Sequence, residues 1–178
     1  MKTTNAKKRT QGGYSFVEVV VAVSILAIGM LSQASLTVTH VGQNVLNKQN
    51  RIALEAVQNQ IEELKSHTFT EVFNDYNETS LQHFAVPELD AAKADADGTV
   101  GRVIFPTATD ISSGLTVLRE DVTSAALGMP RDLDGDGAID TNAKNTTYKF
   151  LPVIVEIRWN SKLGDRSIRV AALLQPRS

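Results

Sequence analysis

The chain has 178 residues, of which 18 are basic and 20 acidic, so its formal net charge is −2, and it contains no cysteine. Its length suits one modest folded domain with an additional segment. The missing cysteines exclude disulfides. Beyond residues 1–13 the chain is acidic and has no basic patch, which argues against general binding to the nucleic-acid backbone.

The N-terminal region combines a basic cluster, a pair of glycines and an apolar run that contains one acid. The basic cluster is at residues 7–9, the second glycine is Gly13, and residues 19–31 are almost purely apolar. This run predicts a helix that enters a membrane. Glu18 lies inside the segment, and a carboxylate in hydrocarbon costs several kcal/mol unless it is paired. Cleavage after Gly13 would create an amine at Tyr14 that could pair with it.

This arrangement resembles the N-terminal motif of type IV prepilins and type II secretion pseudopilins. Gly13 is followed by the aromatic Tyr14, a small polar residue, two apolar residues and Glu18. The resemblance implies that prepilin peptidase cuts between Gly13 and Tyr14 on the cytoplasmic side and methylates the new N-terminus of Tyr14. It also implies an assembly role for Glu18. Tyr14 departs from the family's usual phenylalanine but is close to it in shape.

An ordinary secretory signal peptide is the alternative, because it also has a basic start, an apolar region and a small-residue cleavage site. Residues 32–34, Ser-Gln-Ala, could serve as that site. Glu18 and the amphipathic sequence beyond Ala34 favour the prepilin interpretation. We therefore expect a leader at 1–13, a transmembrane and assembly segment at 14–36, and an extracytoplasmic domain at 37–178.

The distribution of charge agrees with this division of the chain. Residues 1–13 contain four basic residues and no acid, so removing them leaves 14 basic and 20 acidic residues and a net charge of −6. Basic residues remain on the cytoplasmic side of a membrane. We therefore expect a single-pass protein of the bacterial inner membrane with its leader in the cytoplasm, which enters a pilus or pseudopilus after assembly.

The first long element is expected to be a helix from about Tyr14 to about Lys65. Its first part is apolar nearly all round, and beyond Ser32 apolar residues recur at helical spacing. No proline interrupts it, although Gly29 and Gly42 each weaken a helix by about 1 kcal/mol relative to alanine. Two helices with a break near Gly42 are the alternative.

The rest of the chain predicts an antiparallel sheet after an irregular connection at residues 66–97. In that connection, aromatic residues are expected to anchor the chain on the core, and residues 91–98 form a short helix or a surface excursion. The expected strands are 102–105, 115–122, 148–159 and 166–174, the last two joined by a hairpin turn at 160–165. A long helix followed by such a sheet is an α+β plan.

This layout resembles the pilin fold, in which the second half of the helix packs on an antiparallel sheet. The C-terminal hairpin, with its Val-x-Val-x-Ile-x-Trp strand ending at Trp159, is similar to minor pilins of the PilV type and to the I-type minor pseudopilin of type II secretion. The implied partners are prepilin peptidase, an inner-membrane assembly platform and other pilins or pseudopilins in a filament.

An acidic loop at residues 132–140 is the second chemically informative segment. It resembles the first nine positions of the calcium loop of an EF-hand or dockerin. The oxygen ligands expected for Ca²⁺ are the side chains of Asp132, Asp134, Asp136 and Asp140 and the carbonyl of Ala138.

The twelfth position of the loop departs from the calcium pattern, because Ala143 replaces the bidentate glutamate. Asn142, Asn145 or a carboxylate from elsewhere would have to complete the shell. The alternative is an acidic surface turn that is merely solvated. If it binds calcium, the loop is expected to act as a stability clip rather than as an EF-hand sensor.

The sequence contains few features that are typical of an enzyme. The sequence has no nucleophile motif, phosphate loop or His-Glu-x-x-His motif, and His40, His67 and His83 do not have metal-ligand spacing. The sequence therefore predicts a non-enzymatic minor pilin or pseudopilin, a structural subunit in the assembly of a type IV pilus or a type II secretion pseudopilus. The alternatives are a membrane-anchored calcium-dependent adhesion or binding module and a tethered extracytoplasmic enzyme.

Overall fold

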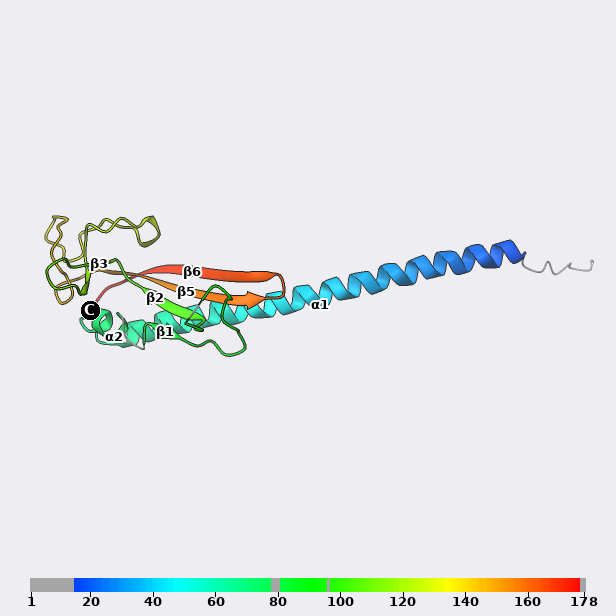
Figure 1. Cartoon of the computed structure of the whole chain (residues 1–178), viewed down its shortest axis with the longest axis horizontal. Coiled ribbons are helices and arrows are strands. Elements are labelled where there is room, and N and C mark those ends of the chain that lie inside the picture. Colours follow the sequence, from blue (N-terminus) through cyan, green and yellow to red (C-terminus); the bar gives the residue numbers. More distant parts are fainter. Residues whose placement is uncertain (1–14, 78–80, 96, 177–178) are drawn as a thin grey trace, which may run out of the picture. The chain divides into compact units, whose positions relative to one another are not determined.

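The computed structural model describes residues 15–77, 81–95 and 97–176 and has a long N-terminal helix followed by antiparallel strands (Figure 1). This arrangement confirms the expected α+β, pilin-like fold class. The helices are α1 (Phe16–Ser66) and α2 (Val72–Tyr76), with a 3-10 turn η1 (Ala125–Leu127). The strands are β1 (His83–Phe84), β2 (Gly101–Ile104), β3 (Thr107–Thr109), β4 (Thr116–Leu118), β5 (Leu151–Ser161) and β6 (Gly164–Leu174).

Helix α1 begins at Phe16 and is continuous past Gly42, so the alternative of two helices with a break near Gly42 is wrong. It ends one residue beyond the predicted Lys65, whose positive charge suits the C-terminal end of the helix dipole. The chain divides into two compact units, residues 1–45 and residues 46–178, and α1 contributes to both.

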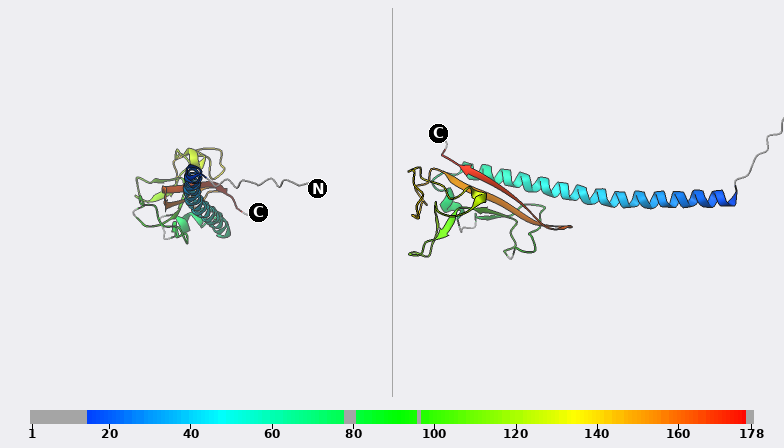
Figure 2. Two further views of the ribbon diagram at one scale, coloured as in Figure 1. Left: turned by 90° about the vertical axis from the view of Figure 1, so that its right-hand side faces the viewer. Right: turned by 90° about the horizontal axis from the view of Figure 1, so that it is seen from above.

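The core of the second unit lies between the C-terminal part of α1 and one face of a four-stranded sheet (Figure 2). The strand order is β1-β2-β5-β6, and every neighbouring pair is antiparallel. The residues of α1 and β5 that form the centre of the core are at most 1% exposed: Ala53, Val57, Leu64, Val153, Val155, Ile157 and Trp159. Alternation along β5 therefore places the predicted apolar row against the helix.

The C-terminal hairpin is confirmed, with a tighter turn than expected. Strand β5 begins at Leu151, three residues after the predicted start, and continues to Ser161, which pairs with Gly164. The connection therefore has only two residues, Lys162 and Leu163. Gly164 has a φ of 104°, a conformation that glycine adopts without strain.

The predicted strand at 115–122 forms only in part. Only Thr116–Leu118 is a strand, and it pairs with β3, which the sequence did not predict. Two residues after β4, Glu120 turns inward and bonds to the backbone of the acidic loop. The strand therefore does not continue to Glu120. The carboxylate of Glu120 is buried among backbone donors of the acidic loop, whereas a continued strand would alternate between buried and exposed side chains.

The irregular connection at 66–97 contains two short elements, α2 and β1, and its expected aromatic anchors are confirmed. Phe73 and Tyr76 of α2 are buried, while Phe69 and Phe84 pack against the core from partly exposed positions. Residues 91–98 form no helix in the part that the structure describes, and Ala91 makes an isolated bridge with Trp159. The ring of Phe84 lies where a Cβ on Gly101, its partner across β1 and β2, would sit.

The opposite face of the sheet carries a charged row. Glu156 of β5 is fully buried between two arginines, Arg102 of β2 and Arg169 of β6, and bonds to both. Burial raises the pKa of Glu156, but the hydrogen bonds from Arg169 and Arg102 outweigh it and hold the pKa below its ordinary value.

Candidate functional site: acidic loop and apolar helix

The acidic loop is ordered by its own aspartates, each of which accepts a backbone N–H from a residue two to five positions further along the chain. Gly135 and Gly137 have positive φ angles of 72° and 89°, which allow the sharp turns. The donors are Gly135 and Gly137 for Asp132, Asp136 for Asp134, Ala138 for Asp136, and Asn142 for Asp140. These bonds lower the pKa of Asp132, chiefly through Gly137, and of Asp140, chiefly through Asn142.

Glu120 joins this loop from the end of β4, although the sequence did not identify it as a site residue. It is fully buried, and its carboxylate accepts the backbone N–H groups of Leu133 at 2.7 Å, Asp134 at 3.3 Å and Asp140 at 3.1 Å. Carboxylate oxygens of Glu120, Asp132 and Asp134 lie within 4.8 Å of one another. The sequence predicts that a carboxylate from outside the loop completes the calcium coordination shell. The spacing of residues within the loop does not identify that carboxylate, because Glu120 lies 12 residues before Asp132.

Lys144 introduces a positive charge at the same carboxylates. Its Nζ lies 2.6 Å from Asp134, 3.3 Å from Asp140 and 3.6 Å from Glu120, and its side chain is 6% exposed. The hydrogen bond to Asp134 is the main reason that the pKa of Lys144 is raised. The loop therefore contains an internal cation.

The two asparagines considered as further ligands make hydrogen bonds of their own. Asn142 donates its side-chain N–H to Asp140, and the Oδ1 of Asn145 accepts the backbone N–H of Leu118 at 2.8 Å. Asp136 and Asp140 also lie outside that group, although both belong to the loop. Oxygen ligands suit a hard divalent cation such as Ca²⁺, and a bound cation would have to share them with Lys144.

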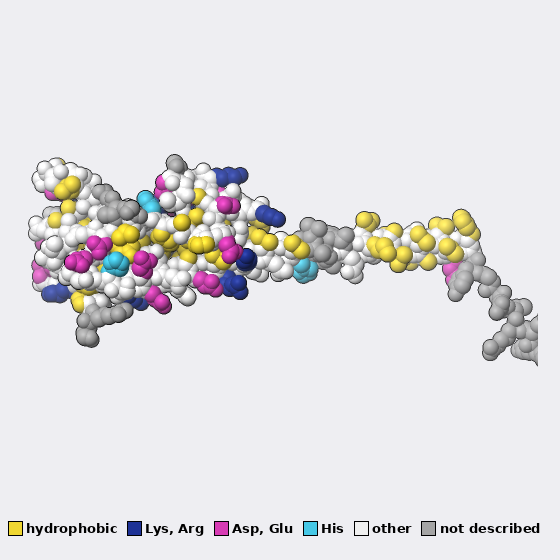
Figure 3. Space-filling view, turned by 90° about the horizontal axis from the view of Figure 1, so that it is seen from below, with side chains coloured by type: hydrophobic (Ala, Val, Ile, Leu, Met, Phe, Trp, Pro, Cys, Tyr) yellow, Lys and Arg dark blue, Asp and Glu magenta, His cyan; other side chains and the backbone are white. Residues whose placement is uncertain are grey.

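The N-terminal half of α1 has a different chemistry. Residues Phe16–Gln33 have a mean hydropathy of 2.0 and are long and apolar enough to cross a membrane, and hydrophobic side chains cover this part of the helix (Figure 3). Glu18 is its single charged residue and is exposed in the first turn. Gly13 and Tyr14, the predicted cleavage and methylation positions, lie outside the described residues.

Residues 8–32 match the family model of the prokaryotic N-terminal methylation motif. The chain carries a type IV prepilin-like signal peptide. This motif supports membership of the type IV pilin or pseudopilin family, whose members are structural proteins, and it confirms the resemblance based on Gly13, Tyr14 and Glu18. It implies processing by prepilin peptidase and assembly with other pilins. No curated protein and no solved structure matches the chain.

The motif and the apolar helix together support membrane anchoring of the chain. Every residue of Phe16–Gln33 is exposed, so the apolar surface of this segment is available to lipid or to other helices. In either environment the carboxylate of Glu18 loses water and requires a partner.

Proposed function

We propose that this protein is a minor pilin or pseudopilin, a structural subunit in the assembly of a type IV pilus or a type II secretion pseudopilus. The exposed carboxylate of Glu18, on a helical surface that is otherwise uncharged, is the observation that carries this proposal. The apolar half of α1 holds the subunit in the inner membrane and later packs among the helices of other subunits. The basic residues at 7–9 favour a cytoplasmic leader and an extracytoplasmic C-terminal domain.

In this mechanism, Glu18 of one subunit neutralises the N-terminal ammonium that cleavage creates at Tyr14 of a neighbour. Both charges are expensive in apolar surroundings when separated, and their attraction is strongest where water is excluded. Pairing therefore favours one axial position of the entering helix over positions that leave either charge unpaired.

The test is Glu18→Val in the full-length protein. Membrane insertion should be retained or improved, because a charge is removed from the apolar segment. Incorporation into filaments, measured by cross-linking to neighbouring subunits, should fall. Ser32→Val is the matched control, because the Ser32 hydroxyl donates to the carbonyl of Ile28 in its own helix and its loss should leave incorporation unchanged. Normal incorporation of Glu18→Val would remove the pairing role.

We further propose that the acidic loop binds Ca²⁺ and acts as a clip that joins the loop to β4. The ligands would be Asp132, Asp134, Asp136, Asp140 and the carbonyl of Ala138, with Glu120 completing the shell in place of the missing twelfth-position glutamate. The closeness of the carboxylates of Glu120, Asp132 and Asp134 supports this assignment. Because Lys144 contacts the carboxylates of Glu120, Asp134 and Asp140, calcium would bind in competition with its ammonium group.

A further inference from the structure

Strand β6 leaves one edge of the sheet open. It is the last strand in the order β1-β2-β5-β6, it is 11 residues long, and among the described residues no strand pairs with its other side. The two-residue connection requires Ser161 and Gly164 to be a hydrogen-bonded pair. Every second residue from Gly164 therefore bonds to β5, and the backbone groups of Asp165, Ser167, Arg169, Ala171 and Leu173 point away from the sheet.

The side chains of β6 that face the helix are incompletely covered. Ile168, Val170 and Ala172 are partly exposed, whereas Ile157, Val155 and Val153, which lie directly across from them on β5, are 0% exposed. Helix α1 thus covers the apolar row of β5 fully and that of β6 only in part. A strand added beside β6 would place its own apolar side chains next to this row and bury it further.

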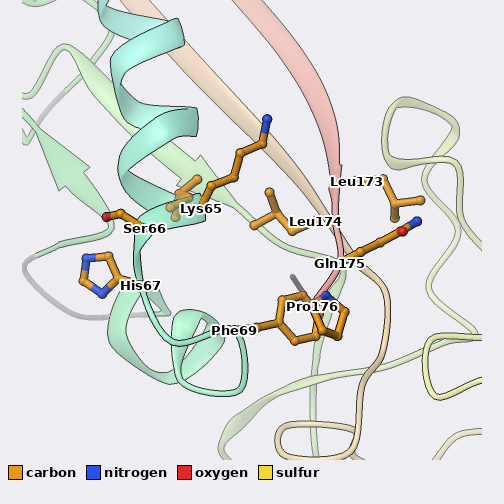
Figure 4. A pocket seen from close by; sticks show the side chains of 9 residues that line it. Lys65, Ser66, His67, Phe69, Leu173, Leu174, Gln175 and Pro176 are labelled. Atoms are coloured by element: carbon orange, nitrogen blue, oxygen red, sulfur yellow. The ribbon is translucent and has the colours of Figure 1, made fainter. Parts of the chain in front are cut away.

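A pocket of about 470 Å³ lies where β6 and α1 end (Figure 4). Apolar side chains from both elements and from the segments that follow them line it: Leu64, Phe69, Leu173, Leu174 and Pro176. Lys65 also lines the pocket and has no ion-pair partner among the residues that the structure describes. The pocket can therefore take an apolar side chain and offer an ammonium group to a carboxylate beside it.

We propose that the open edge of β6 and this pocket together bind an extended peptide segment of a partner protein. The segment adds to the sheet as a strand parallel to β6, places alternate apolar side chains on the α1 side, and ends with an apolar residue in the pocket and its carboxylate at Lys65. Backbone bonds supply affinity in this mode of recognition, and the pocket supplies specificity. The site is separate from Glu18 and does not depend on the assembly role.

The charges along this path favour an acidic segment. Arg166 lies on β6 and Lys65 lies at its end, whereas Arg169 of the same strand is already paired with Glu156. The single acid of the strand, Asp165, is next to the turn and accepts the backbone N–H of Lys93 at 3.2 Å. Complementary charge of this kind selects among partners and speeds association.

The test uses the full chain in detergent micelles and a short synthetic peptide that alternates Glu and Val and ends in Leu with a free carboxylate. We expect the amides of Ser167, Arg169 and Ala171 to gain protection from hydrogen exchange when the peptide binds. A C-terminal amide on the peptide should weaken binding about fivefold, since a charge-assisted hydrogen bond is lost. Lys65→Met should remove this discrimination between the two peptides.

Ala171→Pro removes an outward N–H without touching a bond to β5 and should weaken binding about tenfold, because one ladder bond cannot form. Ala171→Val is the matched control and should bind as the unaltered protein does. A peptide methylated on alternate backbone nitrogens should fail to bind the unaltered protein, which keeps the test valid if the proline variant does not fold.

Equal binding of the methylated peptide, or no binding at millimolar concentration, would overturn the proposal. So would binding of the free-carboxylate and amide peptides with equal affinity. Concentration-dependent protection of the same amides without any peptide would instead assign the edge to a second copy of this chain.

Discussion

The Nζ of Lys144 lies 2.6 Å from Oδ2 of Asp134, and this contact brings an ammonium group into the carboxylates to which we assign calcium. The contact explains how a loop with four aspartates and the buried Glu120 can be ordered before any metal binds. The ammonium group of Lys144 would also compete with calcium, so it should limit how much calcium stabilises the protein.

We expect Ca²⁺ to raise the melting temperature of the full chain in detergent. A ligand that binds only the folded state stabilises it by about 2.7 kcal/mol at a hundredfold excess over its dissociation constant. That constant should be weak, near ~10⁻⁴ M, as in extracellular modules. Asp132→Ala combined with Asp136→Ala should abolish the shift and leave a folded domain. Identical melting curves in chelator and in millimolar calcium would return the loop to the solvated-turn interpretation.

Lys144→Met should enlarge the calcium-dependent shift in melting temperature. Removing the ammonium leaves its three carboxylate partners without their positive charge, so the variant should be less stable than the unaltered protein in chelator and gain more from calcium. Lys149→Met is the control, since Lys149 lies near Gly135 of the same loop and is exposed. A shift that is the same for the Lys144 variant and the unaltered protein would show that the two cations do not compete.

Glu120→Gln should destabilise the domain even in chelator. In the unaltered protein, backbone N–H groups donate to the carboxylate of Glu120. The NH₂ group of glutamine is itself a donor and cannot accept these bonds. Each hydrogen bond to a charged acceptor that is lost costs about 1.5–3 kcal/mol. We expect a loss of about 2–3 kcal/mol in the free energy of unfolding, measured in urea. Glu55→Gln, which alters an exposed pair with Arg51 on α1, should change it by less than about 0.5 kcal/mol.

Gly13→Val should block removal of the leader, because we assign the cleaved bond to the one between Gly13 and Tyr14. Intact mass of the unaltered protein should correspond to a chain that begins at a methylated Tyr14. The variant should retain residues 1–13 and lack the methyl group. A mature N-terminus at Ser35 would instead assign the chain to the ordinary secretory class.

The buried Glu156 should make stability depend on pH. Its pKa is lowered in the folded protein from an ordinary value of 4.5, so its contribution is complete above that value and is lost as the pH falls through the lowered pKa. The difference in unfolding free energy between the unaltered protein and Glu156→Gln should therefore shrink as the pH falls below about 4.5. Urea unfolding at a series of pH values measures it, and a difference that is constant with pH would contradict this assignment.

The long elements of the fold could be predicted because their signals are local. The apolar pattern of α1 and the alternation of β5 and β6 are periodic over many residues, and each pattern selects one face. The strand beginning at Leu115 was overestimated, because its alternation continues through Glu120, whose side chain is directed inward by three backbone donors that come much later in the chain.

The prepilin motif could likewise be recognised, since Gly13, Tyr14 and Glu18 are close in sequence. The acidic loop could be recognised by its spacing, but its neighbours could not. Glu120 and Lys144 join it through contacts formed only when β4 and the following segments come together. Lys144 was not considered in the sequence analysis, because a single lysine between polar residues has no distinguishing pattern.

The close packing of the Phe84 ring on Gly101 has a consequence for how this sheet tolerates substitution. Strand β1 has only two residues, so the ring of Phe84 on Gly101 is a large part of what holds it to β2. Any side chain at position 101 would displace that ring and release β1. Strand β2 would then become a second open edge strand of the sheet. Strands of other molecules could pair with both edges, β2 and β6. A change as small as one methyl group would thus make this domain prone to aggregate.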